Sequence, residues 1–163
     1  MISINPHNNT EIKSYRNNDK EEVEKIIAQS DLAQRKWKTI DISLRIKNID
    51  SVISNLKKYK QESAQLITNE MGKPISESNA EIEKCILLCK YYGENASDFL
   101  ETKKIYENEE NKSFISYEPL GVIFGIMPWN FPFWQVFRFA IPALTLGNGA
   151  VLKHSSNVQG CAK

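Results

Sequence analysis

An uncharged apolar run that ends between two prolines most constrains how this chain can fold. Residues 121–127 read Gly-Val-Ile-Phe-Gly-Ile-Met, and residues 128–132 read Pro-Trp-Asn-Phe-Pro. An apolar run of this length without charge is typical of a strand covered on both faces, as in a parallel sheet. Pro128 must end the strand, because proline has no backbone N–H to give to the ladder. Asn130 is therefore expected at the carboxyl end of the strand, the rim where open α/β folds bind ligands.

The charges of the chain are distributed unevenly along its length. The 163 residues carry 21 basic and 20 acidic side chains, which gives a net charge of +1. The segment 119–163 contains three basic residues and no acidic one. So low a charge density is incompatible with a solvated surface layer and predicts that this segment forms the centre of the fold. The near-neutral total gives no electrostatic reason to expect a nucleic-acid or membrane partner.

Three features of the sequence favour a cytoplasmic protein. The first residues are polar and lack the apolar core and cleavage site of a signal peptide. No apolar run reaches the length of a membrane-spanning helix. Cys85, Cys89 and Cys161 do not form the set that is typical of a secreted disulfide framework. We therefore expect a cytoplasmic location.

Four amphipathic helices are predicted in the first hundred residues, because apolar side chains recur there at the spacing of one helix face. The first helix spans about residues 20–38 and has a stripe that includes Val23, Ile26 and Ile27. The helix boundaries are marked by residues that cap or stop a helix, namely Asp19, Glu22, Asp41, Gly72, Pro74 and Ser76. One stripe per helix predicts layers packed on another element, not a closed bundle. Residues 1–18 show little periodicity and are interpreted as a polar lead-in.

A hairpin and a βαβ unit are predicted in the second half of the chain. Residues 103–107 and 113–118 alternate and flank a polar turn, which is typical of a hairpin. Because a two-stranded hairpin is marginal alone, it is expected to pair with another sheet or another subunit. A helix over residues 131–146 and a buried strand over 150–153 follow the apolar run. Strand, helix and strand make one βαβ unit of a parallel sheet with a right-handed crossover, so the fold class is α/β.

Asn130 is the first candidate for chemistry, because its amide stands at a strand end and a helix start. Such an amide, together with backbone N–H groups, can stabilise the oxyanion that forms when a nucleophile attacks a carbonyl. The alternative is that Asn130 only caps the helix, with Pro132 in its first turn. The local sequence leaves both roles open, and capping is the commoner use of an asparagine at such a position.

Two basic residues of the low-charge segment are further candidates. Lys153 ends the second strand, where its ammonium could reach a ribose or a phosphate, or could simply extend into solvent. Arg138 shares a helix face with Phe131 and Trp134, and no acidic residue occurs in this segment to pair with it. Arg138 could therefore bind the carboxylate of a ligand or an acidic residue from a distant part of the chain.

The cysteines and histidines give no site of their own. Cys161 has no histidine placed to activate it, so it is interpreted as a small buried hydrophobe. Cys85 and Cys89 share a helix face, but His7 and His154 do not complete a metal site with them, and no metal is expected. The ordinary dinucleotide-binding pattern G-x-G-x-x-G does not occur in the sequence.

Several motifs together resemble the aldehyde dehydrogenase superfamily. They are Met-Gly-Lys-Pro at 71–74, the helix of Glu81 and Ile82, Glu-Pro-Leu-Gly-Val at 118–122, Met-Pro-Trp-Asn-Phe-Pro at 127–132, Gly147-Asn148 and Val-Leu-Lys at 151–153. They span essentially the whole chain in the right order. The segments 153–158 and 160–162, Lys-His-Ser-Ser-Asn-Val and Gly-Cys-Ala, are most similar to the succinate-semialdehyde dehydrogenase branch.

The resemblance implies how the chain is divided. Residues 1–101 and 119–163 would belong to the coenzyme-binding domain, with helical layers and the first βαβ unit of a Rossmann-like parallel sheet. Residues 102–118 would form a protruding hairpin in the oligomerisation region of a homo-oligomer. The catalytic domain would be absent, because the family's nucleophilic cysteine, general-base glutamate and pyrophosphate loop belong to later sequence. A separate gene could encode that part.

The resemblance also implies the NAD- or NADP-dependent oxidation of an aldehyde, with succinate semialdehyde as the substrate. In the family a cysteine thiolate attacks the aldehyde, hydride passes to the cofactor, and a glutamate-activated water hydrolyses the thioester. Asn130 matches the oxyanion donor. The positions that contact the cofactor match Ile126, Met127, Pro128, Trp129, Lys153 and Ser156. Arg138 matches the arginine that holds the far carboxylate of the substrate, and Phe131 and Trp134 would line the substrate tunnel.

The choice of cofactor and the activity of the chain alone are further expectations. Ser156 stands where NAD-preferring members often carry an acid that grips the adenosine ribose. An acid there would repel a 2′-phosphate and a serine does not, so NADP should be tolerated. Without the nucleophile the chain alone is expected to be inactive. Two alternatives stay open on the sequence: a non-catalytic remnant, and a small dimerising or binding module that uses the hairpin.

Overall fold

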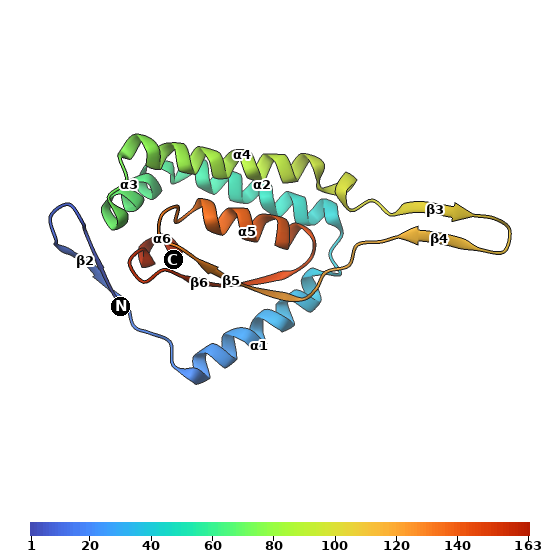
Figure 1. Cartoon of the computed structure of the whole chain (residues 1–163), viewed down its shortest axis with the longest axis horizontal. Helices are drawn as coiled ribbons and strands as arrows, with labels where there is room; N and C mark the ends of the chain where they lie inside the picture. The colour runs from blue at the N-terminus through green and yellow to red at the C-terminus, as the bar shows by residue number, and fades with distance from the viewer.

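A two-stranded parallel sheet lies between helices in the structure, a computed structural model that describes residues 1–163 (Figure 1). Strand β5 (Val122–Met127) pairs with β6 (Gly149–His154) in a register that places Ile126 beside Lys153 and Met127 beside His154. Helix α5 (Trp134–Thr145) connects the two strands. The predicted βαβ unit is therefore confirmed, and the carboxyl ends of both strands meet at one rim.

A layer of three helices covers α5 on its outer side (Figure 1). These helices are α2 (Ile42–Lys58), α3 (Lys60–Met71) and α4 (Ile75–Phe99). The hydrophobic core lies between them and α5 and consists of Ile49, Ile53, Leu56, Ile67, Ile82, Cys85, Ile86, Cys89 and Ile141. This core confirms the predicted layers and the packing role of the two α4 cysteines. No helix is both long and apolar enough to cross a membrane.

Helix α1 (Lys20–Trp37) lies on the other side of the sheet (Figure 1). Its predicted capping box is confirmed, because the Asp19 side chain accepts from the Glu22 backbone and the Glu22 side chain accepts from the Asp19 backbone. The helix is tied to the fold near its end, where Trp37 donates to the Leu144 carbonyl at 2.7 Å. Only this last part of α1 is anchored by hydrogen bonds to the βαβ unit.

The strands are not covered on both faces, so the prediction from the apolar run is wrong on this point. Phe124 and Ile126 are 59% and 67% exposed, whereas Gly125, which faces α5, is buried. The open face is therefore the one opposite α5, where α1 reaches only the start of the strands. For the same reason the predicted stripe of α1 is between 39% and 52% exposed at Val23, Ile26 and Ile27.

The first residues form a hairpin, not the polar lead-in that was predicted. Strand β1 (Ile2–Ile4) pairs antiparallel with β2 (Glu11–Ser14). Ser3 is fully buried, whereas Ile2 and Ile4 are 52% and 47% exposed. The alternation is thus inverted, with the polar residue inside. Hydrophobicity could not reveal this hairpin, because the buried position is held by hydrogen bonds.

A second hairpin protrudes from the body of the molecule (Figure 1). Strands β3 (Lys103–Glu107) and β4 (Lys112–Ile115) pair antiparallel, as predicted, with an irregularity at Ile105. Its apolar side chains lie open to solvent, including Ile105 at 64% and Phe114 at 62% exposure. The hairpin contributes nothing to the core of this chain.

Several predicted boundaries are wrong by a few residues. Helix α4 begins at Ile75 after Pro74, so Ser76 is inside the helix instead of capping it. Helix α5 begins at Trp134 and not at residue 131, because the three residues before it form a turn. Strand β4 ends at Ile115, short of the predicted residue 118. A last short helix, α6 (Gln159–Ala162), follows β6.

Gly125 tests the packing of β5 on α5. A Cβ atom at this position would lie 2.6 Å from the Phe139 ring. We expect Gly125→Ala to lower the free energy of unfolding by about 1–3 kcal/mol, because the added methyl overpacks the contact. Urea unfolding followed by circular dichroism measures the change.

Gly93 supplies the matched control, since it lies inside α4 in an uncrowded position. A Cβ atom there would have the Ile46 side chain as its nearest neighbour, at 3.9 Å. Gly93→Ala should raise stability by roughly 0.5–1 kcal/mol, because alanine has the better helix propensity. Equal urea midpoints for Gly125→Ala and the unmodified chain would show that β5 and α5 are not packed as described.

Candidate functional site

The candidate site lies at the carboxyl ends of β5 and β6. Residues 128–133 leave β5 and turn into α5, and residues 155–158 leave β6 and turn into α6. The first turn contains the predicted oxyanion residue Asn130, and the second contains the predicted cofactor residue Ser156. Both side chains are exposed.

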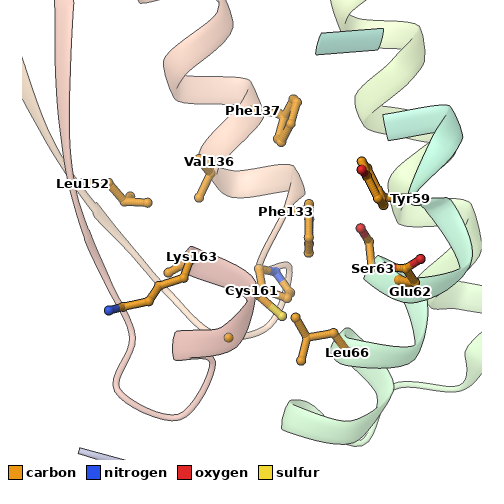
Figure 2. A pocket seen from close by; sticks show the side chains of 13 residues that line it. Tyr59, Glu62, Ser63, Leu66, Phe133, Val136, Phe137, Leu152, Cys161 and Lys163 are labelled. Carbon is orange, nitrogen blue, oxygen red and sulfur yellow. The ribbon is translucent and has the colours of Figure 1, made fainter. Parts of the chain in front are cut away.

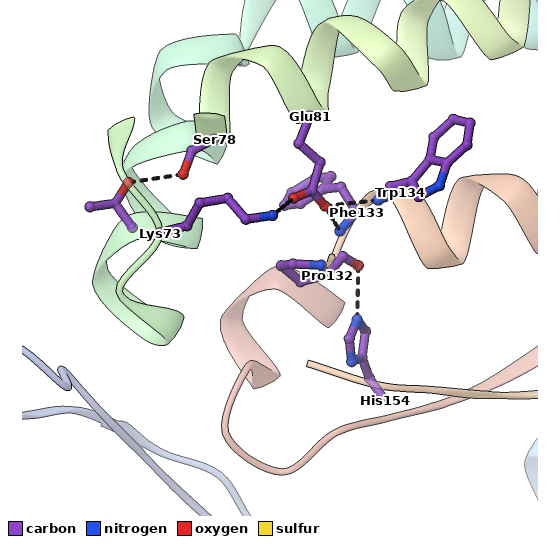
Figure 3. A network of polar contacts seen from close by, with 8 residues as sticks. Lys73, Ser78, Glu81, Pro132, Phe133, Trp134 and His154 are labelled. Atoms are coloured by element: carbon purple, nitrogen blue, oxygen red, sulfur yellow. Dashed lines mark hydrogen bonds and ion pairs between the residues drawn. The ribbon is translucent and has the colours of Figure 1, made fainter. Parts of the chain in front are cut away.

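His154 connects the two turns of the rim. Its ring is buried, with the Nε2 atom 2.8 Å from the Pro132 carbonyl oxygen (Figure 3). Its Nδ1 atom accepts the backbone N–H of Ser155 at 2.8 Å. Because Nδ1 accepts, the ring proton is on Nε2 and is donated to Pro132. The end of β6 is thereby fixed to the turn that carries Asn130.

Glu81 holds the same turn from the opposite side. Its carboxylate, on α4 and 3% exposed, accepts the backbone N–H groups of Phe133 and Trp134, each at 2.9 Å (Figure 3). These are two of the free N–H groups at the start of α5, where the helix dipole also favours a negative charge. The N-cap residue of α5, Phe133, makes no side-chain cap. Asn130 is therefore not the cap of this helix, and that alternative is excluded.

Lys73 completes the support of the turn. Its buried ammonium pairs with the other Glu81 oxygen and lies 3.8 Å from the centroid of the Phe131 ring. The turn is thus held at Phe131 by the ammonium and just beyond it by Glu81 and His154. Just before these contacts, the exposed side chain of Asn130 makes no hydrogen bond to the chain, so its amide is free for a ligand.

A second buried glutamate organises the turn after β6. Glu70, at the end of α3 and 2% exposed, accepts the backbone N–H groups of Gly160 and Cys161 at 2.9 Å each. It also accepts the hydroxyl of Ser3 at 2.7 Å. The start of α6, and with it the turn that carries Ser156, is therefore fixed by α3 and by the N-terminal hairpin.

The predicted cofactor residues, apart from the half-buried Met127, are exposed at the carboxyl ends of β5 and β6. Ile126 and Trp129 are 67% and 51% exposed, and Lys153 stands beside Ile126 in the register of the sheet. Met127 and Pro128 continue the strand into the turn. Lys153 makes no ion pair within the chain, so its ammonium lies free next to an apolar surface.

The predicted substrate residues gather at the start of α5. Arg138 donates from Nη2 to the Gln135 side chain at 2.9 Å on the same helix and pairs with no carboxylate. The alternative of a distant acidic partner is therefore excluded. Trp134 is half-buried, and the ammonium of Lys84, on α4, lies 4.1 Å from its ring centroid.

The structure also contains a cavity of about 590 Å³, and Figure 2 shows the side chains that line it. Helices α3, α5 and α6 surround it together with β6. Its lining is mainly apolar and consists of Tyr59, Glu62, Ser63, Leu66, Pro132, Phe133, Val136, Phe137, Leu152, Gly160, Cys161, Ala162 and Lys163. Asn130, Arg138 and Lys153 are not among these residues, so the cavity and the predicted site are separate features.

None of the three thiols is prepared for nucleophilic attack. Burial raises the pKa of Cys89 to about 12 and also raises the pKa of Cys85. Burial and the carboxylate of Glu70 raise the pKa of Cys161 as well. A nucleophilic cysteine needs a lowered pKa, because the thiolate is the reactive form. No group of three or more His, Cys, Asp or Glu side chains is placed to hold a metal ion.

Sequence reasoning found the two turns but missed the residues that hold them. Glu70, His154 and Ser3 were not predicted to take part. The only local signal was that Glu70 precedes the Met-Gly-Lys-Pro motif, that Lys73 lies within it, and that Glu81 follows it on the next helix. The bond from His154 to Pro132 spans 22 positions and the bond from Cys161 to Glu70 spans 91, which no local pattern encodes.

The fold and the site together define a mixed α/β protein with a parallel βαβ unit and an asparagine-containing turn at the carboxyl ends of its strands. The family model "Aldehyde dehydrogenase family" matches residues 1–163. The chain belongs to the aldehyde dehydrogenase family, and the predicted family and fold class are confirmed.

Two relatives and one solved structure are similar to this chain over 99% of its length. A probable NADP(+) succinate-semialdehyde dehydrogenase of Synechocystis sp. is 40% identical, with 99% of this chain and 36% of that protein covered. The NAD(P)+ succinate semialdehyde dehydrogenase Sad of Escherichia coli is 38% identical, with coverage of 99% and 35%. The crystal structure of succinic semialdehyde dehydrogenase from Streptococcus pyogenes in complex with NADP+ matches with a TM-score of 0.92 at 27% identity, covering 99% and 35%. The chain thus spans about a third of the length of these relatives.

The buried pair of Glu81 and Lys73 should be essential for the fold of the rim. We expect Glu81→Gln to lower the free energy of unfolding by about 3–5 kcal/mol, because it leaves the Lys73 ammonium buried without a counter-charge.

Glu83→Gln is the matched control on the same helix. Its partner Lys60 lies 2.6 Å away in a partly exposed pair, so the loss should stay within about 1 kcal/mol. Similar urea midpoints for the two variants would contradict the role given to Glu81.

The raised pKa values of the thiols predict slow modification. At about pH 8 a thiol with a raised pKa is almost fully protonated, and only the thiolate reacts. We expect Cys85, Cys89 and Cys161 to react with Ellman's reagent much more slowly in the folded chain than in urea. Rapid modification of one thiol in the folded chain, located by mass spectrometry, would show that a reactive cysteine is present after all.

Proposed function

We propose that this chain is the part of an NAD(P)-dependent succinate-semialdehyde dehydrogenase that carries the oxyanion amide and one edge of the cofactor site. The observation that carries the proposal is the turn of residues 128–133. Glu81, Lys73 and His154 hold this turn, while the amide of Asn130 stays unpaired. The names of the two curated relatives support the reaction and the substrate.

In this proposal Asn130 stabilises the charge that develops on the aldehyde oxygen. An amide donor acts best when it is oriented before the reaction, because no reorganisation is then needed as charge forms. The fixed turn supplies that orientation. In the same proposal the attacking thiolate and the glutamate that activates water come from outside these 163 residues, as the resemblance implies. The raised pKa of all three thiols supports this for the thiolate.

The open edge of β5 and β6 fits a nicotinamide dinucleotide. Ile126 and Trp129 offer apolar surface, and the free ammonium of Lys153 can hydrogen-bond a ribose or a phosphate. Ser156 leaves room for a 2′-phosphate without charge repulsion. When bound, the cofactor accepts the hydride from the substrate. The residues of this chain would hold and orient it.

Arg138 is proposed to hold the carboxylate at the far end of succinate semialdehyde. It lies on the helix that follows the Asn130 turn and has no acidic partner. A guanidinium without a counter-charge binds a carboxylate by charge-assisted hydrogen bonds. Phe131 and Trp134 would border the path between the two ends of the substrate.

We propose that the hairpin of residues 102–118 is the contact between subunits of a homo-oligomer, while residues 1–101 and 119–163 belong to the coenzyme-binding domain. Its exposed Ile105 and Phe114 support a partner surface, because apolar side chains on a protruding hairpin gain from being covered. In the same proposal a C-terminal part, on the same or a separate chain, completes the enzyme.

The proposal is tested by measuring NADP reduction with succinate semialdehyde. The 163-residue chain alone should show no turnover above the rate without protein. A fusion of residues 1–163 to the remainder of the Escherichia coli relative should restore it, because the missing nucleophile is then supplied. Within the fusion, Asn130→Ala should lower kcat by about 10²–10³-fold, the cost of losing one oxyanion donor.

Asn95→Ala is the control for this experiment. Asn95 is a helical asparagine on α4 whose side chain bonds only to the Tyr91 carbonyl of the same helix. Its replacement should leave kcat unchanged. Turnover by the chain alone, or equal kcat values for the two alanine variants, would contradict the proposed division of roles.

A further inference from the structure

Lys84 occupies a position next to the proposed substrate residues that the resemblance did not assign. It lies on α4, one turn beyond Glu81, and its ammonium is 4.1 Å from the centroid of the Trp134 ring. A cation over an indole face is attracted by the ring quadrupole. This contact directs the Lys84 side chain across the gap between α4 and the start of α5.

The charge of Lys84 is not neutralised by the chain. Lys84 takes part in no ion pair, whereas Lys60 and Lys73 are paired with Glu83 and Glu81. The carboxylate of Glu81 is close in sequence, but it is buried and already receives Lys73 and two backbone N–H groups. No acidic residue occurs on α5 or in the turn before it. The ammonium therefore remains available to an anion.

Arg138 lies on the same side of α5 as Trp134, because residues four apart share one helix face. Trp134 thus has the Lys84 ammonium over its ring and the Arg138 guanidinium one turn along its helix. Neither cation has a carboxylate partner within the chain, and a bound anion would offset their mutual repulsion. The arrangement favours a ligand that brings one negative charge and an apolar stem.

We infer that Lys84 is a specificity-determining residue which, with Arg138, binds the carboxylate at the far end of the aldehyde substrate. The inference rests on the proposed function, since it presupposes that Arg138 faces the substrate. It adds a second cation from another helix. Because Lys84 is exposed, its contribution is a few-fold in affinity, and its main effect is to favour a charged aldehyde over an uncharged one of equal length.

The test uses the 163-residue chain and two unreactive ligands. One is 4-hydroxybutyrate, in which an alcohol replaces the aldehyde of succinate semialdehyde, and the other is butane-1,4-diol, which lacks the carboxylate. Binding is followed by NMR through the indole N–H signal of Trp134. We expect saturable shifts with 4-hydroxybutyrate only, a roughly two- to fivefold weaker Kd for Lys84→Met, and near-normal binding for Lys84→Arg.

Lys90→Met is the control, because Lys90 is an exposed lysine on the same helix that lies over no aromatic ring. It should bind 4-hydroxybutyrate like the unmodified chain. If Arg138→Met weakens binding and Lys84→Met does not, the inference about Lys84 is wrong and the proposed carboxylate site stands. If the diol and 4-hydroxybutyrate shift Trp134 equally, or neither gives saturable shifts, both are overturned.

Discussion

The buried carboxylate of Glu81 is the interaction on which the rim of the sheet depends. Taking a carboxylate out of water costs several kcal/mol unless hydrogen bonds and a counter-charge compensate it. Here the compensation comes from Lys73 and from two backbone N–H groups at the start of α5. These groups belong to separate segments, so the carboxylate is stable only when all of them are docked. The turn of Asn130 is therefore positioned by the helical layer and not by the strand that precedes it.

A second buried glutamate binds the start of a helix in the same way, after β6. Glu70 receives the first N–H groups of α6, as Glu81 receives those of α5. In each case a β-strand ends, the chain turns, and a buried glutamate from α3 or α4 fixes the start of the next helix. His154 then joins the two turns through Pro132. The sheet has only two strands and is open on one face. These contacts nevertheless hold the two turns at its rim in a set position relative to each other.

Features that depend on a few neighbouring residues could be predicted from the sequence. The capping box at Asp19, the helix stop at Gly72 and the parallel strands followed from signals within a few residues. The local sequence could not exclude that Asn130 caps α5, because Glu81, which binds the free N–H groups at the start of this helix, is about fifty positions away. The hairpin of Ser3 was missed, since its buried position is polar. The apolar run of β5 predicted cover on both faces, but this chain covers only one.

Helix α5 connects the two ends of the proposed substrate site. The contacts that anchor this helix therefore also affect the proposed substrate site. Asn130 stands just before the helix, and Arg138 stands one turn beyond Trp134. Since the start of α5 is fixed by Glu81, the backbone of the turn that carries Asn130 is held in a set position relative to the helix that carries Arg138. Lys84 approaches Trp134 from the helix that also carries Glu81. One buried ion pair thus contributes to the position of the groups proposed to bind the reacting carbonyl and of those proposed to bind the carboxylate, and in this proposal the distance between them would select the substrate.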